Sequence, residues 1–240
     1  MDYKTINLLN KILKLLSHKT YSDHVPSIYF EKVDKNKFKE YILREILNNF
    51  SKEELLNLKS KVFYIGNNYN SAGILIKDNE INKVIIPKLD NVLSSIIICH
   101  ELIHYVIYKN KKDSLRYMSL YDELIPINQE FVFLNEFYKD YIYEHYNYRF
   151  NEMIKRANEI CSYSKNNKIQ SINPSYNTNE IINALSHIYS LLILIQNSDY
   201  GKNNELFKKI IISPNPLEYE LKDNGIYLNK TIIKTLKNMN

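Results

Sequence analysis

The segment His100-Glu101-Leu102-Ile103-His104 contains residue types at a spacing that can bind and use a metal ion. Four residues advance an α-helix by about 400°, so the two histidines lie on one face, one turn apart. Imidazoles at this spacing can bind a single zinc ion, and Glu101 lies where its carboxylate can reach a zinc-bound water. The segment therefore predicts a zinc site with His100 and His104 as ligands and Glu101 as general base.

The segment lies inside an apolar run, from about Val92 to Lys109, that we expect to form a helix capped by Asp90 or Asn91. The run is apolar nearly all round, so this helix should be buried. The alternative interpretation is a core helix whose histidines are only hydrogen-bonded. Burial favours the metal site, because polar groups in an interior are costly unless they are paired or bind a metal.

A catalytic zinc ion needs a third protein ligand. A histidine six positions after His104 is excluded, because Asn110 stands there, so we expect a glutamate from a later helix. The candidates are Glu123, Glu130, Glu136 and Glu144. We choose Glu136 because Asp140, four positions later, faces the same way and can accept a hydrogen bond from a ligand histidine. Glu130 lies about 240° around the helix from Glu136, so both cannot point at the metal.

The pattern of His100-Glu101-x-x-His104 followed by Asn135-Glu136-x-x-x-Asp140 resembles the gluzincin metallopeptidases, which include the thermolysin-like proteases and related aminopeptidases. The resemblance implies that His100, His104 and Glu136 bind zinc and that Glu101 is the general base. It also implies that Asp140 is the hydrogen-bond partner of a ligand histidine.

Two further histidines lie in segments that we expect to be helical. His187, within a strongly apolar helix over residues 180–196, is a candidate stabiliser of the tetrahedral intermediate; a hydrogen-bonded core histidine is the alternative interpretation. His145 lies nine residues after Glu136, about 180° around a continuous helix, so we expect it to face away from the metal.

The pattern along the chain predicts an α+β fold that is mostly helical and zincin-like, with a small antiparallel sheet before the active-site helix. Strands are expected at 27–33, 62–65, 73–76 and 83–86, the last two joined as a hairpin through Asp78-Asn79-Glu80. Helices are expected over 3–18 and 36–50, from a Ser51–Glu54 capping box, over 128–164, and in the C-terminal part near 205–211 and at the end.

The best domain boundary is the polar stretch 165–179, which contains Pro174. We therefore expect a zincin-like catalytic domain over residues 1–165, which contains the sheet and the metal site. Residues 166–240 are expected to form a C-terminal helical subdomain packed on it.

Composition restricts the partners and the compartment. The net charge of +5 comes from 32 basic and 27 acidic residues without a block of five like charges, so we expect a solvated surface and no nucleic-acid partner. The two cysteines imply no disulfide framework. Without an apolar signal segment or a run of 18 apolar residues, we expect no membrane association and a cytoplasmic location.

These observations predict a zinc-dependent metallopeptidase that hydrolyses bonds in a peptide or protein substrate. Two alternatives stay open: a catalytically silent metal-binding or interaction protein with a zincin fold, and an intracellular regulatory protease specific for one partner. Glu101 favours an enzyme over the silent protein, because a silent site has no need of a general base.

Overall fold

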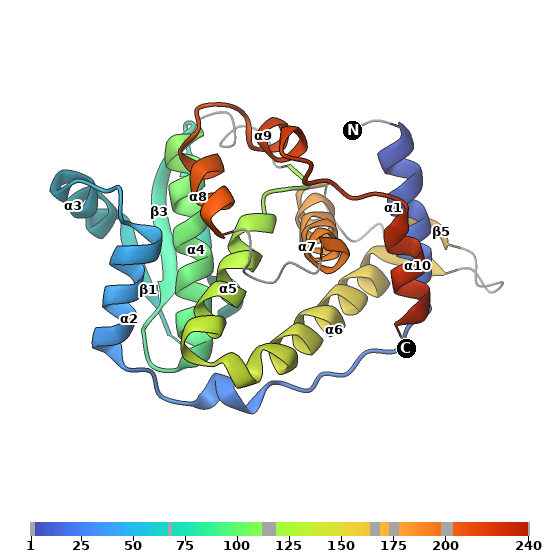
Figure 1. Cartoon of the computed structure of the whole chain (residues 1–240), viewed down its shortest axis with the longest axis horizontal. Coiled ribbons are helices and arrows are strands. Elements are labelled where there is room, and N and C mark those ends of the chain that lie inside the picture. The colour runs from blue at the N-terminus through green and yellow to red at the C-terminus, as the bar shows by residue number, and fades with distance from the viewer. Residues whose placement is uncertain are drawn as a thin grey trace.

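The computed structural model describes residues 3–66, 69–111, 119–163, 169–172, 178–197 and 204–239. The fold is α+β and mostly helical. Helix α4 (Val92–Asn110) lies in the middle, with a three-stranded sheet against one side and helix α5 (Leu124–Phe137) against another (Figure 1). This arrangement places the predicted metal-binding segment in the interior.

Local sequence explains where α4 begins. The Asn91 side chain accepts a hydrogen bond from the Ser94 N–H, and the Ser94 hydroxyl accepts one from the Asn91 N–H, which forms a capping box. Apolar residues around the helix are buried, including Ile96, Leu102 and Ile103. The prediction of a buried helix capped at this position is confirmed.

The sheet is mixed rather than antiparallel as predicted. Its strands are β1 (Val62–Ile65), β2 (Gly73–Lys77) and β3 (Glu80–Pro87), in the order β1-β3-β2. The hairpin between β2 and β3 is confirmed, and Asp78 and Asn79 in its turn have φ values of 53° and 60°. Strand β3 lies between the other two and pairs with β1 in parallel and with β2 antiparallel. Strand β2 therefore lies at an edge of the sheet.

The N-terminal part contains α1 (Tyr3–Leu16), α2 (Lys35–Tyr41), a π-helical turn (Ile42–Ile46) and α3 (Lys52–Lys61). The capping box of Ser51 and Glu54 is confirmed. The strand predicted at 27–33 is wrong. Ser27–Phe30 instead form a 3-10 turn, termed η1, and an isolated bridge from Lys32 to Asn91 is the pairing found there.

The single helix predicted over 128–164 is also wrong. Helix α5 ends at Phe137, a 3-10 turn (Lys139–Tyr141) follows, and α6 spans Ile142–Ile160. Tyr138, with φ −143° and ψ 43°, leaves the helical conformation. Helix α5 also begins earlier than expected, at Leu124. Pro126 is tolerated there because it lies in the first turn, where backbone N–H groups have no partner within the helix.

The C-terminal part contains α7 (Thr178–Asn197), α8 (Asn204–Ile212), α9 (Leu217–Asp223) and α10 (Thr231–Asn238). Helix α7 packs on α5 and α6, and α8 packs on α4 and α5. A short ladder of β4 (Cys161–Tyr163) and β5 (Ile169–Ile172) follows α6. The predicted domain boundary at 165/166 lies outside the described residues.

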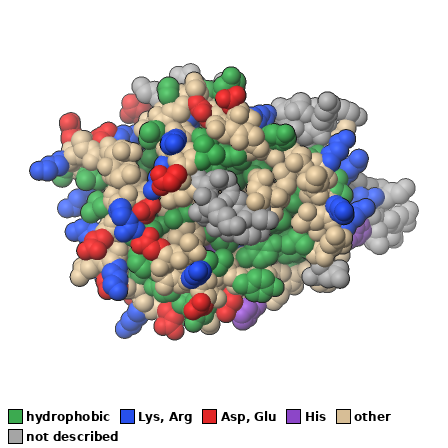
Figure 2. Space-filling model, viewed as in Figure 1, with side chains coloured by type: hydrophobic (Ala, Val, Ile, Leu, Met, Phe, Trp, Pro, Cys, Tyr) green, Lys and Arg blue, Asp and Glu red, His purple; other side chains and the backbone are tan. Residues whose placement is uncertain are grey.

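Two properties concern the surface charge and the long apolar helix α4. Acidic and basic side chains are interspersed on the side of the molecule that carries α2 and α3 in Figure 2. In the described part of the chain, α4 alone is long and apolar enough to span a membrane, and 72% of its apolar window is buried inside the protein. That burial is typical of the core helix of a soluble protein. Cys99 and Cys161 are buried and free.

Candidate metal centre

The imidazoles of His100 and His104 converge with the carboxylate of Glu123. The two Nε2 atoms lie 3.1 Å apart. Glu123 Oε2 lies 3.0 Å from Nε2 of His100, and Glu123 Oε1 lies 3.5 Å from Nε2 of His104. Among the residues that the structure describes, this is the one group of three or more metal-ligating side chains whose ligand atoms lie within 4.8 Å of one another.

The separations within this group fit a tetrahedral metal ion. Ligand atoms about 2.0–2.1 Å from a tetrahedral zinc lie roughly 3.3–3.4 Å from one another. The two Nε2 atoms lie 3.1 Å apart, and the nearest Glu123 oxygen lies 3.0 Å from Nε2 of His100 (Oε2) and 3.5 Å from Nε2 of His104 (Oε1). Oε2 of Glu123 is buried, and the ring nitrogens nearest to it are Nε2 of His100 at 3.0 Å and Nδ1 of His187 at 3.4 Å. A buried carboxylate oxygen of this kind is costly unless a cation binds it, so the donor set suits a divalent metal.

Glu130 contacts the other ring nitrogen of His100. Its Oε1 lies 2.6 Å from Nδ1, and its side chain is fully buried. An ionised carboxylate only accepts hydrogen bonds, so His100 carries its proton on Nδ1. Once Nε2 has lost its proton, its lone pair faces Glu123 and His104, which is the tautomer that a metal ligand requires.

Glu130 is also the centre of a buried hydrogen-bond network. Nε of Arg149 donates to Oε2 at 2.7 Å, and Nη2 of Arg149 donates to Oε1. Nε2 of His145 lies 3.0 Å from Oε2, and the Tyr29 hydroxyl lies 2.6 Å from Nδ1 of His145. His145 therefore faces the site, contrary to the prediction that it faces away; the helix break at Tyr138 invalidates an angle counted from Glu136.

The electrostatics of the site favour a cation beside Glu123. Burial alone lowers the pKa of His100, but the interactions with Glu123 and Glu130 outweigh it and raise that pKa to about 10. Burial would raise the pKa of Glu123, yet the neighbouring histidines hold it well below its usual range. Both carboxylates are therefore ionised, and the space beside Nε2 of His100 attracts positive charge.

The structure does not bring Glu136, the third ligand predicted from the sequence, to the histidines; Glu123 is the glutamate that lies beside both of them. Glu136 is exposed, and both its oxygens accept hydrogen bonds from Nη2 of Arg44 at 2.6 Å. The reason is helical geometry. Glu130 and Glu136 point about 240° apart on α5, and the Glu130 side of the helix is the one that packs on α4.

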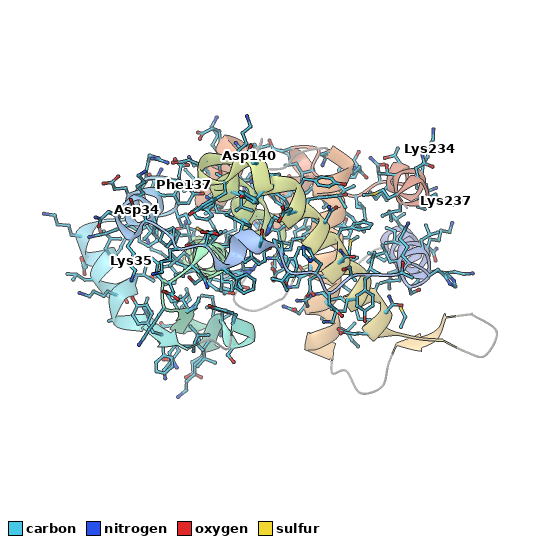
Figure 3. All side chains as sticks on the ribbon, turned by 90° about the horizontal axis from the view of Figure 1, so that it is seen from below. Asp34, Lys35, Phe137, Asp140, Lys234 and Lys237 are labelled. Atoms are coloured by element: carbon cyan, nitrogen blue, oxygen red, sulfur yellow. The ribbon has the colours of Figure 1, made fainter. Side chains whose placement is uncertain are left out.

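Asp140 also lies away from the metal ligands. It is exposed on the 3-10 turn between α5 and α6, and Figure 3 labels it there with Phe137. Because α5 ends at Phe137, Asp140 does not follow Glu136 along one helical face. Glu130, rather than Asp140, accepts the hydrogen bond that we predicted from a candidate ligand histidine, and the donor is Nδ1 of His100.

Glu101 and the three candidate ligands line one cavity of about 850 Å³. The Glu101 side chain is half-buried, and burial raises the pKa of its carboxyl. One wall is formed by Gly73, Ile74 and Ile76 of β2, an edge strand. A carboxylate, a candidate metal position and a sheet edge therefore meet in one space.

His187 is the predicted site residue that the structure places beside the candidate ligands from a distant helix. Its Nδ1 lies 3.4 Å from Glu123 Oε2, and its ring stacks near that of His100, with centroids 6.3 Å apart. Burial lowers the pKa of His187 to about 3, so the ring is neutral at physiological pH. His187 is close enough to contact a molecule in the cavity, which it also lines.

Sequence reasoning missed the roles of Glu123 and Glu130, although a signal was present. Seven residues turn a helix through about 700°, so two glutamates seven apart face the same way. Glu123 precedes α5 and makes no capping hydrogen bond, which leaves its carboxylate directed to the histidines. The Asp122 carboxyl, whose pKa burial raises to about 7, also lines the cavity.

Comparison with known proteins adds no relative: no protein-family model matches the chain, and neither a curated protein nor a solved structure is significantly similar to it.

Proposed function

We propose that this protein is a zinc-dependent metallopeptidase whose metal ligands are His100, His104 and Glu123. The observation that carries the proposal is the convergence of these side chains at tetrahedral separations beside Glu101 in one cavity. Three protein ligands leave a fourth position open, which distinguishes catalytic from structural zinc sites. The resemblance to gluzincin peptidases stays a prediction, now with a different third ligand.

Bound zinc would supply a Lewis acid that polarises the scissile carbonyl and lowers the pKa of a water molecule. Glu101 would accept a proton from that water and deliver it to the leaving amine. Burial favours this role, because it raises the pKa of the Glu101 carboxyl toward neutral pH. A group whose pKa lies near the working pH can both accept and donate a proton. His187, neutral and close to Glu123, is the candidate group for contact with the developing oxyanion.

A peptide substrate also has a backbone surface to pair with. Strand β2 is an edge strand, and three of its residues line the cavity. An extended peptide that added to this edge would have its backbone fixed by main-chain hydrogen bonds. We therefore propose that the substrate binds extended along β2 with its scissile bond at the metal ligands.

The experiment is digestion of a mixed peptide library by the zinc-loaded protein, with cleavage followed by mass spectrometry. Cleavage that a chelator abolishes, that zinc restores and that Glu101→Gln lacks is the expected result. Stoichiometric zinc binding without cleavage of any library peptide would instead favour the catalytically silent metal-binding protein.

A further inference from the structure

We infer that Tyr29 and His145 are positioning residues of the candidate metal site. Through them, metal binding is coupled to the docking of the N-terminal segment formed by residues 19–33. This inference rests on the metal site of the proposed function and does not depend on peptide hydrolysis.

A continuous hydrogen-bond chain leads from Tyr29 to the ligand His100. The Tyr29 hydroxyl lies 2.6 Å from Nδ1 of His145, whose Nε2 lies 3.0 Å from Oε2 of Glu130. The other oxygen of Glu130 lies 2.6 Å from Nδ1 of His100. Tyr29 and His145 are each 1% exposed, and Glu130 is fully buried, so these contacts are shielded from bulk solvent.

The donors in this chain have one consistent arrangement. Arg149 donates to both oxygens of Glu130, so this carboxylate is ionised and accepts from His100 and from His145. Neutral His145, with its proton on Nε2, presents a lone pair at Nδ1, to which the Tyr29 hydroxyl donates. This hydrogen-bond chain therefore fixes which nitrogen of His145 carries the proton and how its ring is oriented. Through Glu130 it does the same for His100, and so it orients Nε2 of His100, the candidate ligand atom.

The segment that carries Tyr29 has an exposed part and an anchored part. In the exposed part, the Ser22 N–H donates to Asn151 and Asp23 lies 3.8 Å from Lys155. In the anchored part, η1 packs on α4 and Lys32 forms a bridge to Asn91. Residues 19–26 form neither helix nor strand (Figure 1). Residues 20–25 are exposed. Tyr29 is buried in η1, with its ring edge-on to Tyr148 of α6 at a centroid distance of 5.3 Å. Val25 and Tyr29 also line the cavity of the metal site. The Tyr29 side chain thus connects this segment to the site.

Coupling follows because binding free energies are reciprocal. If the docked Tyr29 orients His100 for metal, then bound metal must strengthen the docking of Tyr29 by the same factor. Loss of one buried hydrogen bond changes an equilibrium by about three- to tenfold. Tyr29→Phe should therefore weaken zinc binding by about three- to tenfold, and zinc should slow local opening of residues 27–33 by a similar factor.

The first test measures zinc affinity of the full chain by competition with a chelator. We expect a three- to tenfold loss, roughly, in Tyr29→Phe, and no further loss when Tyr29→Phe is added to His145→Phe, because the chain is already broken. The matched control is Tyr41→Phe. Tyr41 is equally buried and its hydroxyl accepts a hydrogen bond from Gln129 at 2.6 Å, but it does not line the cavity.

The second test is hydrogen exchange of residues 27–33 with and without zinc. We expect zinc to slow exchange in the wild type and in Tyr41→Phe, and to have little effect in Tyr29→Phe. An unchanged affinity in Tyr29→Phe, an equal loss in Tyr41→Phe, exchange that zinc leaves unaltered, or a wild type that binds no zinc would each overturn the inference. Zinc binding and coupling without peptide cleavage would support it while contradicting the proposed function.

Discussion

Glu123 and Glu130 contact the two ring nitrogens of the same histidine. Oε2 of Glu123 lies 3.0 Å from Nε2 of His100, and Oε1 of Glu130 lies 2.6 Å from Nδ1. Seven positions separate the two glutamates, so the residue before α5 and a residue two turns along the helix share one direction. One carboxylate is placed to bind a metal together with the histidine, and the other fixes the proton on the opposite nitrogen.

This relationship predicts an order of zinc affinities. Glu123→Ala removes a direct ligand and should abolish stoichiometric binding, whereas Glu130→Ala should weaken it by about 10–100-fold. Chelator competition measures both. The matched control is Glu136→Ala, because that exposed glutamate pairs only with Arg44 among the contacts seen here; its affinity should equal that of the wild type. Loss of zinc in Glu136→Ala but not in Glu123→Ala would show that Glu136 is the third ligand, as predicted from the sequence.

Zinc affinity should rise with pH. The pKa of His100 is raised to about 10 in the metal-free site, so at neutral pH zinc must displace one proton from this histidine. The apparent association constant should therefore increase by about tenfold per pH unit between pH 6 and 8. Calorimetry in buffers of different ionisation enthalpy should detect one proton released per zinc bound. An affinity independent of pH over this range would show that His100 is already deprotonated.

Glu101→Gln should keep zinc and lose hydrolysis. Glu101 lines the cavity but is not one of the three candidate metal ligands. The substitution therefore removes the proton acceptor and leaves the ligands in place. Loss of a positioned general base lowers the rate by roughly 10²–10⁴-fold. The measurement is cleavage of a library-derived peptide by variants with equal zinc content. A cleavage rate equal to that of the wild type would exclude Glu101 as the base.

His187→Phe should lower the rate of hydrolysis and leave zinc affinity nearly unchanged. His187 lies 3.4 Å from Glu123 and is neutral, so it is placed to donate a hydrogen bond rather than to supply charge. Removal of an oxyanion donor typically lowers kcat by roughly 10²–10³-fold. Steady-state kinetics should show this loss in kcat with little change in KM. A wild-type kcat would leave His187 without a catalytic role.

The parts of the fold that depend on local sequence were predictable. The Asn91 cap, the apolar face of α4 and the turn at Asp78 and Asn79 each follow from neighbouring residues, and the structure contains all three. The central position of β3 was not predictable, because strand order depends on contacts between distant segments.

The candidate site was predictable only where it lies on one helix. His100, Glu101 and His104 share α4, so their spacing determines their geometry. The third ligand depends on where α5 begins and ends. The helix expected from residue 128 left Glu123 outside it. The break at Tyr138, which removes Asp140 from the face of Glu136, has no marked Gly or Pro signal. The prediction assumed that Glu136 and Asp140 lie on one face of a continuous helix, and for that reason it selected Glu136 instead of Glu123.

The measurement that tests the central claim most directly is anomalous diffraction at the zinc absorption edge from crystals of the zinc-loaded protein. We expect one strong peak about 2 Å from Nε2 of His100, Nε2 of His104 and a carboxylate oxygen of Glu123. No peak between these three side chains, or a peak at Glu136 instead, would contradict the account.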